Sequence, residues 1–128
     1  MGKGVNIETA DRKLLQDLFP SELSDHFGIG NYQTLCNIET KSEYWLIDFE
    51  EYNELPSGHE VWEYESKGFT QSRLIHDFPI RGKGVFLRIK TRRFRHKDTH
   101  KTIKRNFSFI AHGSKLTQEL SDFLKGTD

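Results

Sequence analysis

The sequence predicts an α+β fold in which N-terminal helices and a C-terminal helix pack against an antiparallel β-sheet. Apolar residues recur at helical spacing near both ends of the chain and alternate with polar residues through its middle. Leu, Ile, Val and Phe supply 34 of the 128 residues, which suits the core of one ordinary domain. We therefore expect a single domain over residues 1–128, with no membrane-spanning segment and no secretory signal.

Local patterns divide this domain into four regions. The first is helical, because Leu14, Leu18 and Phe19 lie at helical spacing. Thr9 is its expected N-cap, and Pro20 either breaks the helix or opens a second short one. The expected boundaries are a helical region over 1–30, an acidic β region over 31–70, a basic β-hairpin region over 71–111 and a C-terminal helix over 112–126.

The acidic β region contains two alternating segments, 32–38 and 44–49, which predict strands. A loop is expected over 50–60, and a further short strand over 61–64. Trp45 and Trp62 are expected in the core. The single cysteine, Cys36, excludes an internal disulfide and is expected to be a buried strand residue.

The basic region contains the clearest strand pattern, over 85–94. Val85, Leu87 and Ile89 point one way and predict the core face, because side chains alternate along a strand. Residues 73–78 are the expected antiparallel neighbour, 97–100 a turn, and 102–110 a returning strand. The opposite face of the strand is expected to present Phe86, Arg88, Lys90, Arg92 and Phe94.

An apolar stripe predicts the C-terminal helix. Leu116, Leu120, Phe123 and Leu124 lie at the spacing of one helix face. Ser114 is the expected N-cap.

The net charge is zero, but it is unevenly distributed. Residues 1–70 carry a net charge of −9, and residues 81–105 carry +10. Such asymmetry is typical of a nucleic-acid-binding stretch. Two aromatic residues border the basic strand, Phe86 and Phe94, and each is expected either to stack on a base or sugar or to lie in the core. The expected DNA contacts are Arg81, Lys83, Arg88, Lys90, Arg92, Arg93, Arg95, Lys97, Lys101, Lys104 and Arg105.

The charge pattern leaves alternatives open. The acidic half either keeps apart from the basic strand, which makes a dipolar surface, or supplies ion-pair partners for the basic strand within the same chain.

We expect no catalytic residue, metal site or cofactor, because no nucleophile motif or glycine-rich phosphate loop is present. His96 and His100 are expected to be exposed turn residues. A small metal-dependent hydrolase would need both to converge with Asp98.

Several runs resemble the N-terminal region of a bacterial insertion-sequence transposase family. They are residues 65–69 (ESKGF), 77–83 (DFPIRGK), 88–95 (RIKTRRFR) and 109–119 (FIAHGSKLTQE). The resemblance implies a zinc-ribbon-like DNA-binding head that accompanies a separate DDE-type catalytic nuclease. His96 and Thr99 stand where the family has knuckle cysteines, which implies that the zinc is lost and that packing holds the hairpin.

Two functions follow from these observations. The first is a non-catalytic module that binds duplex DNA, in a bacterial cytoplasm and associated with the nucleoid. The second is a protein-interaction module that docks on a separately encoded transposase catalytic subunit or associates with itself. The sequence leaves the oligomeric state open.

Overall fold

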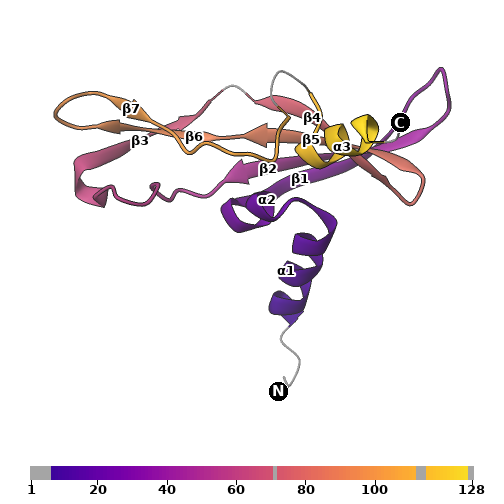
Figure 1. Cartoon of the computed structure of the whole chain (residues 1–128), viewed down its shortest axis with the longest axis horizontal. Helices are drawn as coiled ribbons and strands as arrows, with labels where there is room; N and C mark the ends of the chain where they lie inside the picture. Colours follow the sequence, from indigo (N-terminus) through magenta and orange to yellow (C-terminus); the bar gives the residue numbers. More distant parts are fainter. Residues whose placement is uncertain (1–6, 71, 112–114, 127–128) are drawn as a thin grey trace.

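The computed structural model describes residues 7–70, 72–111 and 115–126, and it confirms the α+β class (Figure 1). The strands form two sheets. A four-stranded main sheet has the order β1-β2-β5-β4, and a three-stranded sheet has the order β3-β6-β7. The elements are α1 (Ile7–Leu18), α2 (Ser21–His26), β1 (Phe27–Cys36), β2 (Glu43–Glu51), the 3-10 helix η1 (Val61–Glu63), β3 (Tyr64–Phe69), β4 (Arg73–Ile80), β5 (Lys83–Lys90), β6 (Arg92–His96), β7 (Thr102–Ile103) and α3 (Gln118–Lys125).

The smaller sheet extends from the end of the main sheet, at the left of Figure 1. We call it the arm, and we define it as residues 60–70 and 92–105. Within the described parts of the chain, no helix is long and apolar enough to cross a membrane.

The main sheet is mixed. β1–β2 and β4–β5 are antiparallel as expected, but the central pair β2–β5 is parallel, so the expectation of a wholly antiparallel sheet is wrong. The chain leaves β2, builds β3 in the arm and then forms β4 before it returns as β5. A long connection of this kind is what a parallel pair requires.

The core lies on one face of the main sheet. Val85, Leu87 and Ile89 are buried there as predicted, beside Ile75 of β4. Phe19, Leu23 and Phe109 join the same cluster from the helical region and from the segment before α3, and Trp45 packs against it half-buried.

The predicted strand over 85–94 is two strands, because the backbone leaves the ladder at Thr91. The Thr70 amide donates to the Thr91 carbonyl at 2.7 Å, and the two side-chain hydroxyls lie 2.6 Å apart. The alternation therefore shifts, and Phe94 is 3% exposed instead of sharing a face with Arg88 and Lys90. The returning strand over 102–110 is likewise shorter, since only Thr102–Ile103 forms β7.

The helix ends differ from the expectations. Thr9 lies inside α1 and is not its N-cap. The N-cap of α3 is Thr117, whose hydroxyl accepts from the Leu120 amide at 3.3 Å, while Ser114 lies outside the described residues. Of the predicted stripe, Leu120 is buried, whereas Phe123 and Leu124 are exposed.

Two burial predictions are wrong. The expected strand over 61–64 begins as η1, which leaves Trp62 71% exposed. Cys36 is exposed at the end of β1, which is an edge strand of the main sheet.

Candidate nucleic-acid interface

The basic face of β5 is neutralised by β2. The parallel register places Asp48 beside Arg88 and Glu50 beside Lys90. All three cations of β5 form ion pairs: Arg88 Nη1 lies 3.3 Å from Asp48 Oδ1, Lys90 Nζ 3.6 Å from Glu50 Oε2, and Lys83 Nζ 3.8 Å from Glu43 Oε1. The dipolar-surface hypothesis is therefore wrong, because the acidic residues lie directly on the basic strand.

Neither predicted stacking residue offers a free ring. Phe94 is buried inside the arm. Phe86 is half-buried and stacks on His76, with 4.6 Å between ring centroids and 12° between planes. Tyr44 and Phe86 form an edge-to-face pair, with 5.5 Å between their ring centroids.

Glu51 joins the two sheets. It ends β2 and is only 2% exposed. Its Oε1 accepts from the Arg92 amide at 2.7 Å, and its backbone carbonyl accepts from Arg92 Nε at 2.8 Å. Its Oε2 lies 3.5 Å from Arg105 Nε. Three predicted DNA contacts thus have structural roles, since Arg92 and Arg105 hold this joint and Arg95 pairs with Glu65.

Burial raises the pKa of Glu51 above its ordinary value of 4.5, against the opposing effects of the Arg92 amide and Arg105. The folded state therefore holds this proton more tightly than the unfolded chain does. The part of the stability that depends on this proton is complete below pH 4.5 and is lost as pH rises through the raised pKa. We therefore compare the free energies of unfolding of wild type and Glu51→Gln, and we expect the difference (wild type minus variant) to fall as pH rises through this window. Urea titrations at a series of pH values measure it. A difference that rises with pH would contradict the assignment.

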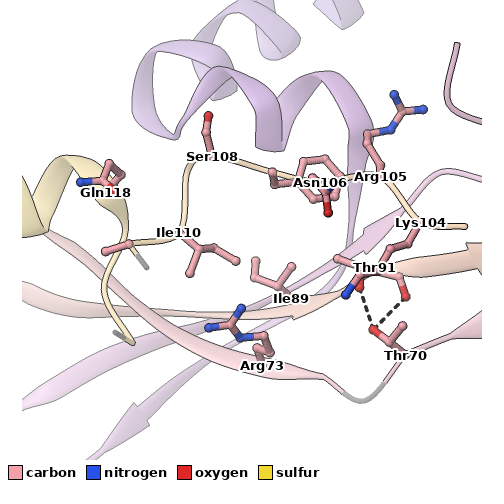
Figure 2. A pocket seen from close by; sticks show the side chains of 12 residues that line it. Thr70, Arg73, Ile89, Thr91, Lys104, Arg105, Asn106, Ser108, Ile110 and Gln118 are labelled. Atoms are coloured by element: carbon pink, nitrogen blue, oxygen red, sulfur yellow. Dashed lines mark hydrogen bonds between the residues drawn. The ribbon is translucent and has the colours of Figure 1, made fainter. Parts of the chain in front are cut away.

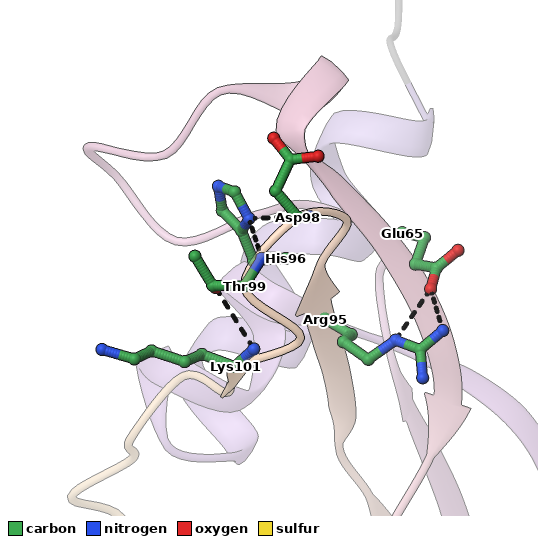
Figure 3. Close-up of polar contacts among 6 residues, drawn as sticks. All are labelled: Glu65, Arg95, His96, Asp98, Thr99 and Lys101. Atoms are coloured by element: carbon green, nitrogen blue, oxygen red, sulfur yellow. Dashed lines mark hydrogen bonds and ion pairs between the residues drawn. The ribbon is translucent and has the colours of Figure 1, made fainter.

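The turn between β6 and β7 is built around His96 (Figure 3). His96 Nδ1 accepts from the amides of Asp98 and Thr99, both at 3.1 Å, and Nε2 lies 3.5 Å from Glu63 Oε2. The expectation of an exposed turn residue is wrong for His96, which is half-buried, and holds for His100. Among the described residues, no three His, Cys, Asp or Glu side chains are grouped to hold a metal ion.

Glu65 anchors the neighbouring strand. Its Oε1 accepts from Arg95 Nε at 2.8 Å and also from Nη2, as Figure 3 shows. These bonds lower the pKa of Glu65 below its ordinary value. Arg95 is consequently held against the arm's own acidic residue.

The unpaired cations gather on the arm. The arm carries eight Lys or Arg residues against four acidic ones, Glu60, Glu63, Glu65 and Asp98. Arg95 and Arg105 form ion pairs, and Arg92 is held by hydrogen bonds to Glu51. The other five have neither kind of contact with a described acidic residue: Lys67, Arg93, Lys97, Lys101 and Lys104. Four of these were predicted. Lys67 was missed, because it lies outside the basic stretch of the sequence and joins the other cations only through the pairing of β3 with β6.

The predicted contacts do not form one patch. Arg81 lies in the β4–β5 turn with φ of 52°, at the opposite end of the molecule from the β6–β7 turn (Figure 1). The structure therefore divides the predicted contacts into four groups. These are the paired cations of β5, the structural residues Arg92, Arg95 and Arg105, four unpaired cations on the arm, and Arg81 in a distant turn.

A cleft of about 670 Å³ lies where the arm meets the main sheet (Figure 2). Thr70 and Thr91 line it from the strand break, and Arg73 and Ile89 line it from the main sheet. Residues 104–108, 110 and 111 line it from the connection to α3. These segments are far apart in the sequence, so no local pattern could have revealed the cleft.

The fold and these surfaces define an α+β domain with a mixed main sheet and a cationic β-arm. Comparisons with protein-family models, curated proteins and solved structures found no match to this chain.

Proposed function

We propose that this chain is a non-catalytic DNA-binding module that contacts duplex DNA through the arm. The observation that carries the proposal is the separation of charge: the cations of β5 are paired within the chain, whereas five on the arm are not. Phosphate oxygens are the natural partners of such side chains. The resemblance to a transposase N-terminal region agrees with this role, in a bacterial cytoplasm and at the nucleoid.

The shape of the arm suits a duplex. A two-stranded β-ribbon fits the major groove, which is about 12 Å wide, and the β6–β7 hairpin of the arm has this form. Lys97 and Lys101 flank the β6–β7 turn, and Arg93 and Lys104 follow toward the joint. The Lys97 amide donates to the Glu63 carbonyl at 2.8 Å, so the exposed Trp62 lies beside this turn. Trp62 thereby replaces Phe86 and Phe94 as the aromatic residue available to a sugar or base.

Salt-dependent titration tests the proposal. If all five free cations contact phosphates, the slope of log K against log salt is expected to be about −4.5. Replacing Lys97 and Lys101 with Gln is expected to reduce it to about −2.7. The measurement is fluorescence anisotropy of a labelled duplex from low to moderate salt.

Arg81→Gln is the matched control, because it removes an exposed cation at the far end of the molecule. It is expected to leave the slope unchanged. Binding that is absent at low salt, or an equal loss in Arg81→Gln, would overturn the proposal. Arg92 is unsuitable for such a test, since it holds the Glu51 joint and lies over the Phe69 ring at 4.4 Å.

Exposed apolar side chains favour a second candidate, a protein-interaction module. Leu14 and Leu18 are exposed on α1, which projects away from the sheets in Figure 1. Ile29 and Tyr32 are exposed on the edge strand β1. The candidate partners are a separately encoded transposase catalytic subunit or a second copy. The charge pattern alone also allows the acidic half of one copy to pair with the basic strand of another, but β2 and β5 of the same chain already make these pairs.

The two candidates are separated by replacing Leu14 and Leu18 with Glu. Under this second candidate, the double variant loses self-association in light scattering or co-purification with the catalytic subunit. Under the DNA-binding proposal alone, both quantities are unaffected and duplex affinity stays near wild type.

A further inference from the structure

The cleft between the arm and the main sheet has the size of a small-molecule site. Its volume of about 670 Å³ falls within the range of about 300–1,000 Å³ that is usual for ligand pockets. The paired hydroxyls of Thr70 and Thr91 fix its wall at the strand break.

The charge in the cleft is positive and unbalanced. Arg73 and Lys104 line it, and neither forms an ion pair with a described residue. Arg105 also borders it, but its side chain turns away from Thr91 and Arg73 in Figure 2. Arg105 is engaged by Glu51 and by the carbonyls of Glu54 and Leu55, at 3.3 and 3.4 Å from Nη2. None of the described residues that line the cleft is acidic.

The remaining surface is partly apolar. Phe107 and Ile110 line the cleft and are half-buried, whereas Ile89, the β5 partner of Arg73, is 1% exposed. A matching ligand must therefore bring negative charge to two cations and an apolar surface to the neighbouring apolar side chains. A phosphate monoester carries a charge of about −1.5 to −2 at neutral pH, and it matches two cations better than a single carboxylate does.

We propose that the cleft binds a phosphate monoester attached to an apolar or aromatic body. Arg73 and Lys104 hold the phosphate, with the planar guanidinium of Arg73 suited to two parallel hydrogen bonds. Phe107 and Ile110 cover the body. The phosphate comes either from a small molecule or from the 5′ end of a nucleic-acid strand, since the recognised chemistry is the same.

Binding of phenyl phosphate to the full chain tests this inference, by methyl and amide NMR shifts and by isothermal titration. We expect saturable shifts at Thr70, Ile89, Thr91 and Ile110. The affinity for phenyl phosphate is expected to fall at least tenfold in Arg73→Gln. Benzoate, inorganic phosphate and benzyl alcohol are each expected to bind the wild-type chain at least tenfold more weakly than phenyl phosphate. A 5′-phosphorylated oligonucleotide that displaces phenyl phosphate, where its 5′-hydroxyl counterpart does not, assigns the strand end as the source. Failure of both oligonucleotides to displace it assigns a small molecule.

Two variants keep this inference separate from the DNA proposal. Arg73→Gln is expected to keep duplex binding, and the Lys97→Gln, Lys101→Gln double variant is expected to keep phenyl phosphate binding. Absence of saturable shifts, equal affinity for benzyl alcohol, or unchanged affinity in Arg73→Gln would overturn the inference, whatever the duplex titration shows.

Discussion

Glu51→Ala is expected to lower the free energy of unfolding by about 3 kcal/mol, because it leaves the Arg92 amide without its acceptor and opens a cavity where a side chain only 2% exposed was packed. The variant removes the acceptor for the Arg92 amide and the carboxylate beside Arg105 Nε. Both contacts tie the main sheet to the arm. Urea denaturation followed by the fluorescence of Trp45 and Trp62 measures the loss.

Glu51→Gln is the control for this experiment. Its amide oxygen still accepts from Arg92, and it imitates the protonated form that burial favours. We expect it to keep most of the stability at neutral pH. Equal loss in the Ala and Gln variants would show that the negative charge itself holds the joint, contrary to the direction of the pKa.

Thr117→Val is expected to lower the free energy of unfolding by about 2 kcal/mol, from the combined loss of a helix cap and of a hydrogen bond to a charged group. Thr117 is fully buried, and its hydroxyl donates to Asp77 Oδ1 at 2.9 Å. Asp77 is itself buried, so valine leaves its carboxylate without this donor.

Thr117→Ser keeps the hydroxyl and is expected to lose less than half as much stability in the same urea titration. The helical signal of α3 in circular dichroism provides a second readout. Full stability in Thr117→Val would contradict the assigned role of this side chain.

Local patterns predicted the elements but not how they pair. Alternation placed Val85, Leu87 and Ile89 correctly in the core, because period-two patterning depends only on neighbouring residues. The parallel β2–β5 pairing depends on where the chain returns after forming the arm, so no local pattern contains it. The break at Thr91 also escaped prediction, because the residue that Thr91 contacts there, Thr70, lies 21 residues away in the sequence.

The candidate site was predicted in part for the same reason. The sequence identified the basic stretch, and four of the five unpaired arm cations belong to it. It did not reveal that Asp48 and Glu50 neutralise Arg88 and Lys90, because this depends on the register of two strands distant in sequence. Arg73 was not predicted as a site residue, since the cleft that it lines forms only when segments distant in sequence meet.

Amide NMR shift mapping with a short duplex tests the central claim most directly, because it reports where DNA lies as well as whether it binds. The account predicts perturbations concentrated on the arm, over residues 92–105 and around Trp62 and Lys67, with β5 and the Arg81 turn unaffected. Perturbations centred on Arg88 and Lys90, or no perturbation at low salt, would contradict it.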